Sequence, residues 1–256
     1  MSISDNLMFD GKVALVTGGN SGIGRETAIS FAQKGANVVI AARRESESLE
    51  TLEQIHAAGG KAEFVKTDVS DESQVEAMVA QTIKAFGRLD FAFNNAAITG
   101  EAIPLDEYRR KMWDQVISIN LTGVWLCMQN EIKYMKANGG GSIVNTTSIA
   151  GHKGSPNLPA YSVSKWGVIG MTKAAARGYG QYGIRVNAVS PGHTETPMLG
   201  LPDDDDDERL NALIEQYPLG RIGQSDDIAK AVIWLCSDSA SFITGVALPV
   251  EGGIIA

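Results

Sequence analysis

The sequence predicts an α/β fold: a Rossmann-like, doubly wound, seven-stranded parallel sheet with helices on both faces. Three observations indicate this fold class. Short apolar runs alternate with amphipathic stretches along the chain. Glycines end many of the amphipathic stretches, as they commonly end helices. The first apolar run leads into a glycine-rich turn and then a helix, the start of a βαβ unit. Strands and helices that alternate in this way form parallel sheets covered on both faces.

Seven strands and six longer helices are expected in order along the chain. Most of the strands are short runs of apolar and β-branched residues, which is typical of strands buried on both faces. The expected strands span residues 12–17, 36–42, 62–67, 89–93, 142–147, 185–189 and 246–250. The expected helices span residues 23–34, 45–58, 70–86, 112–137, 160–181 and 225–236. Gly35 is placed to end the first helix, and Ser225 is expected to cap the last one.

A single domain over residues 1–256 is the expected organisation, because no proline- or serine-rich linker divides the chain. Residues 194–224 show no long periodic pattern, and we expect them to be irregular or short-helical and to include a substrate lid. An acidic run, Asp203 to Asp207 followed by Glu208, lies within this segment. We interpret it as solvated lid surface rather than a metal or cationic-ligand site, because hard-cation loops interleave their ligands with turn residues.

The overall charge and composition argue against several classes of protein. The net charge is −8 and basic residues do not cluster, which argues against binding to nucleic acid. No apolar run approaches the length needed to cross a membrane, and the first residues do not resemble a signal peptide. Cys127 and Cys236 are far apart and have no metal-ligand neighbours, so we expect buried thiols and a cytoplasmic protein.

A glycine-rich turn follows the first strand and has the sequence TGGNSGIG. Glycines allow the backbone to approach a ligand closely, and the N-terminus of the next helix offers free N–H groups to a pyrophosphate. The spacing is G-x-x-x-G-x-G rather than the commoner G-x-G-x-x-G. Its position between a strand and a helix predicts a dinucleotide site. The residues expected to contact the dinucleotide here are Gly18, Asn20, Ser21, Gly22, Ile23 and Gly24.

Two arginines stand at the end of the second expected strand, where an NAD-binding protein usually carries an acidic residue for the ribose 2′-hydroxyl. These residues are Arg43 and Arg44, and no acidic residue is present at this position. A guanidinium suits a 2′-phosphate by its charge and its two-pronged geometry, so NADP is favoured and NAD remains possible. The alternative is that both arginines only cover the start of the next helix as solvated surface.

Tyr161 and Lys165 are four residues apart in an expected helix, so both side chains leave the same face one turn apart. An ammonium beside a phenol favours the phenolate, and we expect it to lower the pKa of Tyr161. A tyrosine tuned in this way exchanges a proton with a substrate hydroxyl or carbonyl near neutral pH. By itself the pair is weak evidence, because chance can supply this spacing.

The whole chain resembles the short-chain dehydrogenase/reductase family in its single-domain branch. TGGNSGIG resembles the family's cofactor loop, and Asn94-Asn95-Ala96-Ala97 resembles its NNAG signature with alanine replacing the glycine. Asp68-Val69 is similar to the family's adenine-contacting pair. Pro191-Gly192 with Thr194 and Thr196 is similar to the segment that holds the nicotinamide carboxamide. The resemblance thus implies cofactor contacts for Asp68, Val69, Asn94, Ala96, Tyr161, Lys165, Pro191, Gly192, Thr194 and Thr196.

The resemblance also implies roles for four catalytic residues. Tyr161 would be the acid/base, and Lys165 would lower the pKa of Tyr161 and hold the nicotinamide ribose. Ser148 would donate a hydrogen bond to the substrate oxygen. Asn120 would hold a water that links Lys165 to solvent. The implied reaction is NAD(P)-dependent hydride transfer between a carbonyl and a secondary alcohol.

Two other functions are weighed against this one. One is a non-catalytic dinucleotide-binding or redox-sensing module, and the other is an epimerase or dehydratase of the same superfamily. Loop residues that we expect to face a small-molecule carbonyl or alcohol substrate are His152, Ser155, Leu158 and His193. The family usually pairs two apolar helices across subunits, which implies a homotetramer, with a dimer possible. No metal site is expected.

Overall fold

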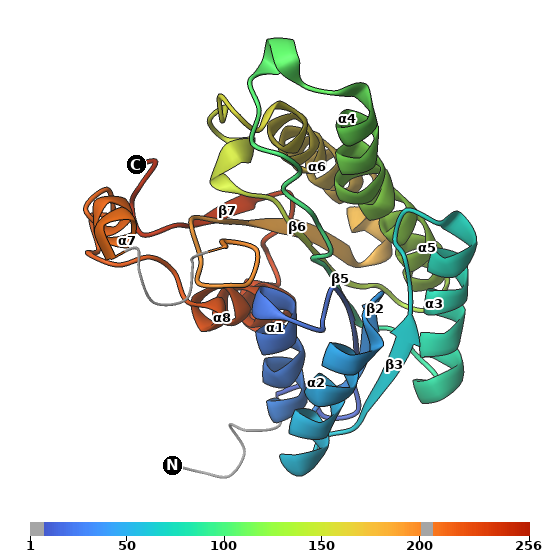
Figure 1. Ribbon diagram of the computed structural model, residues 1–256. Helices are drawn as coiled ribbons and strands as arrows, with labels where there is room; N and C mark the ends of the chain where they lie inside the picture. The colour runs from blue at the N-terminus through green and yellow to red at the C-terminus, as the bar shows by residue number, and fades with distance from the viewer. Residues whose placement is uncertain (1–7, 201–206) are drawn as a thin grey trace.

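The computed structural model describes residues 8–200 and 207–256, which form a seven-stranded sheet between two layers of helices (Figure 1). All strand pairs are parallel, in the order β3-β2-β1-β4-β5-β6-β7. The strands are β1 Val13–Thr17, β2 Asn37–Ala42, β3 Ala62–Lys66, β4 Phe91–Asn94, β5 Gly141–Thr146, β6 Ile184–Pro191 and β7 Ala247–Val250. The predicted fold class is confirmed.

The helices divide between the two faces of the sheet. Residues of α1 (Gly22–Gln33), α2 (Glu45–Ala57) and α8 (Ser225–Cys236) pack on one face. Residues of α3 (Glu72–Phe86), α5 (Gly123–Ala137) and α6 (Pro159–Tyr179) pack on the other. Two further helices, α4 Arg110–Ile117 and α7 Asp207–Ile214, lie toward the ends of the strands (Figure 1).

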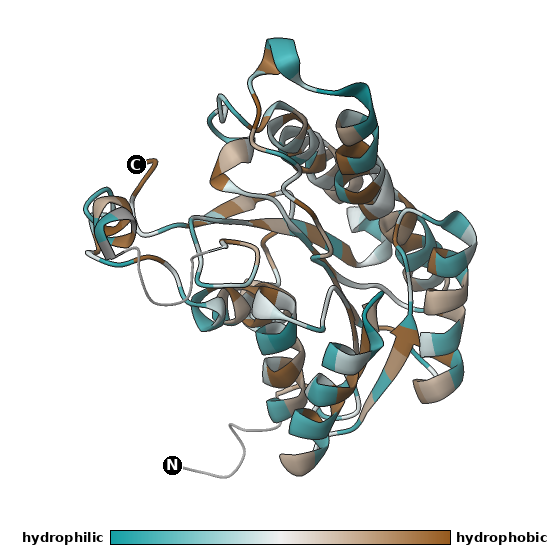
Figure 2. Ribbon diagram, in the orientation of Figure 1, coloured by the Kyte–Doolittle hydropathy of each residue, from teal (hydrophilic) through white to brown (hydrophobic). Residues whose placement is uncertain are grey.

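Alternating side chains of each central strand enter the two helical layers. In β1, Leu15 packs against the layer of α3, α5 and α6, whereas Ala14 and Val16 pack against the layer of α1, α2 and α8. All five residues of β1 are buried, as the continuous apolar run predicted. Figure 2 shows the hydrophobic strands between helices whose outer faces are hydrophilic.

The strands end in register along one edge of the sheet, and this positions the site. Thr17 pairs with Ala41 on one side and with Asn94 on the other, and Asn94 pairs with Asn145. The loops that leave these strands therefore begin side by side. Crevices outside the carboxyl ends of parallel strands are where such sheets bind ligands.

One expected helix is interrupted. Residues 112–137 were expected to be continuous, but α4 ends at Ile117, a π-helical turn covers Ser118–Thr122, and α5 starts at Gly123. The N–H of Gly123 bonds the Ser118 carbonyl, five residues back. Polar side-chain bonding at Asn120, described below, accompanies this wider turn.

The expected cap of the last helix is wrong by one residue. Gln224 is the N-cap of α8, and Ser225 is its first helical residue. The Gln224 N–H donates to the Asp227 carboxylate over 2.8 Å, and the Gln224 side chain accepts from the Asp227 N–H, which forms a capping box. By contrast, Gly35 follows α1 with a φ of +93°, as its role at the helix end required.

Among the residues that the structure describes, no helix has both the length and the apolar character that a membrane crossing requires.

Candidate active site

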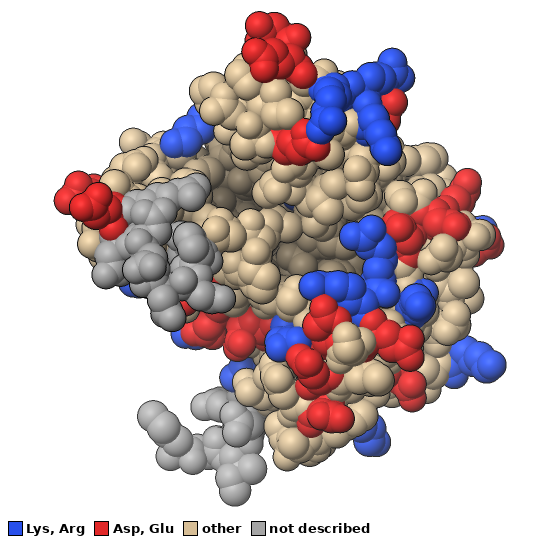
Figure 3. Space-filling model, in the orientation of Figure 1, with Lys and Arg blue, Asp and Glu red and all other residues tan. Residues whose placement is uncertain are grey.

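A cavity of about 1000 Å³ lies at the carboxyl ends of the strands. Its wall combines the glycine-rich turn, the ends of β2, β4, β5 and β6, the start of α6 and the segment after β6. Figure 3 shows this face hollowed, with mostly uncharged walls and basic groups along one edge. The volume and mixed lining suit a dinucleotide together with a small substrate.

The glycine-rich turn is built by close backbone contacts. The Gly18 N–H donates to the Ala41 carbonyl over 2.7 Å, and Gly18 has a φ of +66°. A Cβ on Gly24 would lie 2.2 Å from the Gly18 carbonyl oxygen, so only glycine fits there. The turn delivers the N-terminus of α1 to the cavity, where the N-cap Ser21 makes no side-chain capping bond. Free N–H groups at a helix N-terminus suit a pyrophosphate.

Most residues that the sequence assigned to the site lie on the cavity wall, and four do not. The assigned residues on the wall are Gly18, Asn20, Ser21, Gly22, Ile23, Arg43, Arg44, Asp68, Val69, Ala96, Ser148, Ser155, Leu158, Tyr161, Lys165, Pro191, Gly192, His193, Thr194 and Thr196. Gly24 is off the wall because its role is to pack against Gly18. The other three are Asn94, Asn120 and His152.

Asn94 is buried within the sheet rather than facing the cavity. Its Nδ2 donates to Glu131 Oε2 and to Asn145 Oδ1, each over 3.0 Å. His152 turns inward, where its Nε2 lies 2.8 Å from the hydroxyl of the fully buried Ser190. The side chains of Asn94 and His152 therefore bond buried polar partners and do not line the cavity. The cofactor contact of Asn94 and the substrate contact of His152 remain predictions.

Asn120 does not line the cavity but bonds a segment that does. Its Oδ1 accepts from the Ile98 N–H over 2.9 Å, and its Nδ2 donates to the Ile98 carbonyl over 2.8 Å. The side chain is fully buried. Both ends of the amide thus fix the segment after β4, and Ile98 of that segment lines the cavity.

Tyr161 and Lys165 lie one turn apart near the start of α6, as predicted, and both reach the cavity. Lys165 Nζ donates to the Thr146 carbonyl over 2.9 Å and lies 5.4 Å from the centre of the Tyr161 ring. Ser148 follows β5, and its Oγ accepts from the Ala150 N–H over 3.2 Å. One phenol, one ammonium and one hydroxyl therefore converge on the same cavity.

Burial controls the protonation of this pair. It raises the pKa of Tyr161, although a hydrogen bond with Ser148 opposes the shift. Burial also lowers the pKa of Lys165 to about 7. The expected fall in the pKa of Tyr161 is therefore absent from this structure, because loss of water disfavours the phenolate and the ammonium alike. Lys165 can gain or lose its proton near neutral pH.

The two arginines stand beside the glycine-rich turn. Arg44 Nη2 donates to Ser21 Oγ over 3.2 Å, and Arg44 Nη1 lies 2.9 Å from Glu47 Oε1. Arg43 Nη1 is 3.8 Å from Asp68 Oδ2, and its side chain is 59% exposed at the mouth of the cavity. Arg44 is also the N-cap residue of α2, so it covers the start of the next helix, as the alternative interpretation of the two arginines expected. Both guanidinium-bearing residues nevertheless line the cavity between the end of β2 and the glycine-rich turn.

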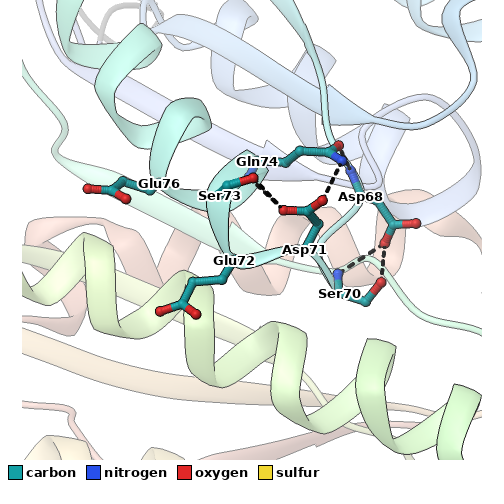
Figure 4. Close-up of a pocket in the computed structure, with 7 residues that line it drawn as sticks. All are labelled: Asp68, Ser70, Asp71, Glu72, Ser73, Gln74 and Glu76. Carbon is teal, nitrogen blue, oxygen red and sulfur yellow. Dashed lines mark hydrogen bonds between the residues drawn. The ribbon is translucent and has the colours of Figure 1, made fainter.

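A second, shallower hollow contains several acidic residues at the start of α3 (Figure 4). Asp71 is the N-cap of α3, and its Oδ1 accepts from the Gln74 N–H over 3.1 Å. A hydrogen bond from the Ser73 hydroxyl, followed by those from the backbone N–H and the side chain of Gln74, lowers the pKa of Asp71. Asp68 Oδ1 likewise accepts from the backbone N–H of Ser70 over 3.0 Å. The acids therefore stabilise the turn and the helix end.

Within residues 8–200 and 207–256, no three histidine, cysteine or acidic side chains are grouped as a metal site would require. Asp203 to Asp206 of the acidic run lie outside the described residues. Glu208, in α7, is exposed.

Sequence reasoning missed several polar residues around the cavity. Thr17 Oγ1 accepts from the N–H groups of Asn95 and Ala96 over 2.9 and 3.2 Å, which fixes the turn after β4. Lys153 lines the cavity, and Tyr217 binds His193. The strand-end position of Thr17 was a usable signal, whereas nothing local in the sequence linked Tyr217 to His193.

The comparisons with known proteins agree with this geometry. The family model described as enoyl-(acyl carrier protein) reductase matches residues 18–255. The chain belongs to the short-chain dehydrogenase/reductase family. A short chain dehydrogenase/reductase of Aspergillus oryzae is 42% identical over 95% of both chains. A 2,5-dichloro-2,5-cyclohexadiene-1,4-diol dehydrogenase of Sphingobium indicum is 45% identical over 96% of this chain and 98% of its own. A cyclohexanol dehydrogenase of Acinetobacter is 40% identical over 95% of both chains.

Solved structures of short-chain dehydrogenases share the fold over nearly the whole chain. Levodione reductase superposes with a TM-score of 0.92 at 37% identity, covering 96% of this chain and 98% of its own. Carveol dehydrogenase from Mycobacterium avium, in complex with NAD, also gives 0.92 at 30% identity, covering 97% and 99%. The protein is thus an NAD(P)-dependent oxidoreductase that interconverts a carbonyl and an alcohol by hydride transfer.

Proposed function

We propose that the protein is an NADP(H)-preferring dehydrogenase and ketoreductase whose substrates are cyclic secondary alcohols and their ketones. The observation that carries the reaction type is the convergence of Tyr161, Lys165 and Ser148 on one cavity beside the glycine-rich turn. The cyclic substrate class is suggested by the relatives named for a cyclohexadiene diol and for cyclohexanol.

The proposed chemistry assigns one task to each residue. When bound, the nicotinamide cofactor would supply or accept the hydride. Tyr161 would give a proton to the carbonyl oxygen during reduction and take it back during oxidation. Ser148 would donate a hydrogen bond to the same oxygen as negative charge develops. Lys165, whose pKa is about 7, would stabilise the phenolate and pass the proton onward.

The NADP preference is supported by charge at the end of β2. Arg43 and Arg44 line the cavity beside Ser21, and a 2′-phosphate there would meet two guanidiniums. An NAD preference is instead suggested by carveol dehydrogenase, which has the same fold and was solved in complex with NAD. The residues present fit the phosphate by charge.

Three further features complete the proposal. Residues 1–256 would act as one domain, with residues 194–224 as a lid over the substrate. A cytoplasmic location is supported by two buried cysteines without disulfide partners, Cys127 and Cys236. A homotetramer, or a dimer, is supported by exposed apolar side chains on α5 and α6.

The deciding experiment is a panel of cyclic and acyclic alcohols and ketones, each assayed with NADPH or NADP and with NADH or NAD at the nicotinamide absorbance. We expect turnover of ring alcohols and ketones, with the higher kcat/KM for the phosphorylated cofactor. Turnover of acyclic substrates alone would reject the cyclic class. A higher kcat/KM with NADH would reject the NADP preference and leave the reaction type standing.

A further inference from the structure

We propose that His193 determines specificity by donating a hydrogen bond from its Nε2–H to a second oxygen atom of the substrate, separate from the oxygen that reacts. The preferred substrates would then be ring alcohols and ketones that carry another hydroxyl, carbonyl or carboxylate. This inference rests on the proposed function, because it concerns the substrate bound in the same cavity.

His193 is held at both its backbone and its ring. It follows β6 and Gly192 and lines the cavity together with Tyr161 and Ser148. Its backbone N–H donates to Tyr217 Oη over 2.7 Å, and its ring Nδ1 lies 2.8 Å from the same oxygen. The two rings meet edge to face, with centres 6.1 Å apart. One phenol therefore fixes both the position of the residue and the rotation of its imidazole.

The hydrogen bonds also select the tautomer of His193. Tyr217 Oη already accepts the backbone N–H, so its own hydrogen is free to be donated. Within residues 8–200 and 207–256, the only acceptor that this hydroxyl contacts is His193 Nδ1. Nδ1 is then an acceptor, and the ring hydrogen resides on Nε2. The structure shows no partner for Nε2 among those residues, which leaves it available to a ligand.

Tyr217 is itself tightly seated, and this makes the donor rigid. Its side chain is only 4% exposed. A Cβ on Gly192 would lie 3.0 Å from Tyr217 Oη, and a Cβ on Gly252 would lie 2.9 Å from its Cδ1. Two backbone segments thus approach the ring as closely as glycine allows. A hydrogen-bond donor held in place before the ligand arrives loses little entropy on binding.

The local charge favours an oxygen acceptor on the ligand. Lys153, from the loop after β5, lines the same cavity. Burial and, to a lesser extent, this ammonium lower the pKa of His193, so the imidazole is neutral at neutral pH. A neutral N–H donor near an ammonium attracts a hydroxyl or carbonyl oxygen, and a carboxylate still more. The remaining wall supplies apolar contacts for a carbon ring, including Ile98, Leu158 and Met198.

The test compares substrates that differ in the second oxygen. Wild-type kcat/KM is measured for cyclohexanol, cyclohexane-1,4-diol and 4-hydroxycyclohexanecarboxylate with the preferred cofactor. We expect the two substituted alcohols to be preferred by about 10-fold, which is the value of one hydrogen bond to a well-placed donor. His193→Leu should reduce the preference for cyclohexane-1,4-diol to near unity, and Tyr217→Phe should reduce it by several-fold. Tyr182→Phe, at a partly exposed tyrosine outside the cavity, is the matched control.

Two measurements keep the test decisive. If His193→Leu fails to fold, His193→Met replaces it with the same expected loss, and nitrogen NMR of the three histidines in the wild-type protein reports the tautomer directly. A hydrogen on Nδ1 of His193, or an unchanged preference in folded His193→Leu, would overturn the proposal. Absence of wild-type turnover with every ring alcohol would instead reject the proposed function. A preference that disappears equally in Tyr182→Phe would also overturn the role of His193.

Discussion

At the scale of single residues, the site contains two side chains, Tyr161 and Lys165, whose pKa values are shifted by burial. Tyr161 and Lys165 share a cavity wall, and lack of water raises the pKa of the phenol and lowers that of the ammonium. A neutral tyrosine is the form that can donate a proton to a carbonyl. The raised pKa of Tyr161 favours this protonated form.

Tyr161→Phe should remove turnover and retain cofactor binding. The substitution deletes the proton-transferring hydroxyl and keeps the ring in place. We expect kcat to fall by about 10²–10⁴-fold, the usual contribution of general acid–base catalysis. The dissociation constant for NADPH, followed by fluorescence titration, should change less than about 3-fold. Full activity in this variant would remove Tyr161 from the mechanism.

Arg43→Ala and Arg44→Ala should discriminate between the two cofactors. If the guanidiniums hold a 2′-phosphate, each substitution raises KM for NADPH by about 10-fold, the value of a charge-assisted hydrogen bond. KM for NADH, which lacks the phosphate, should move less. Arg110→Ala, on the exposed start of α4, serves as the control. Equal changes for NADPH and NADH would show that the arginines only shape the local surface.

Glu131 should make stability depend on pH. It is fully buried, and burial raises its pKa to about 7, although the hydrogen bond from Asn94 opposes the shift. Below the ordinary pKa of 4.5 the residue is protonated in both the folded and unfolded states. Between pH 4.5 and about 7 only the folded protein keeps the proton, so this contribution to stability is lost as pH rises.

Glu131→Gln should therefore flatten the pH profile. The neutral amide has nearly the same shape and does not titrate, so about 3 kcal/mol of pH-dependent change should disappear between pH 4.5 and 7. The free energy of unfolding in urea, measured across this range, provides the comparison. Glu76→Gln, at an exposed glutamate of α3, is the control. An unchanged profile would mean that Glu131 is ionised in the folded protein.

At the scale of elements, the π-helical turn between α4 and α5 is the feature that links the sequence to the site. It places Asn120 so that its amide bonds both the N–H and the carbonyl of Ile98. This ties the helical layer to the segment that follows β4. Asn120→Ala should leave two backbone groups without partners and lower the free energy of unfolding by about 2 kcal/mol. Urea denaturation would detect the loss.

Asn120→Ala should affect activity as well as stability. Because Ile98 lines the cavity, its movement should also lower kcat. Asn130→Ala, which removes a side-chain bond to the Leu126 carbonyl of the same helix, is the comparison. Equal stability of wild-type protein and Asn120→Ala would contradict the supporting role of the amide.

Much of the fold could be predicted because apolar periodicity and helix-ending glycines are local signals. The strand boundaries differ by at most two residues from expectation, and Gly35 ends its helix as foreseen. The π-helical turn was missed because it depends on Ile98, which is 22 residues away from Asn120. The Ser225 cap was wrong because Asp227 selects Gln224 as the cap.

The sequence could not predict the direction in which individual side chains point. Asn94 and Asn95 are adjacent in a strand end, and only the second lines the cavity. His152 and Ser155 lie in one loop, yet His152 turns inward to Ser190. Position along a motif therefore identified loops that border the cavity, while partners distant in sequence determined which of their residues line it.

At the scale of the whole molecule, α5 and α6 carry large apolar side chains that are exposed among the residues that the structure describes. Trp125 is 47% exposed on α5, and Val163 and Trp166 are 46% and 53% exposed on α6. The two helices are in contact with one another on the same face of the sheet. We propose that these exposed apolar side chains belong to an interface, because an isologous contact between copies would bury them.

Trp166→Glu should consequently dissociate the proposed assembly. A carboxylate buried in the proposed contact would lose water without gaining a cationic partner, so association should weaken by several orders of magnitude. Sedimentation should change from a multiple of the 27.2 kDa chain to a smaller species. Leu49→Glu, at a residue 46% exposed on α2, should leave the mass unchanged. Because α6 also carries Tyr161 and Lys165, we expect the dissociated variant to lose activity with the interface, and a fully active monomer would show that the site needs no support from a second copy.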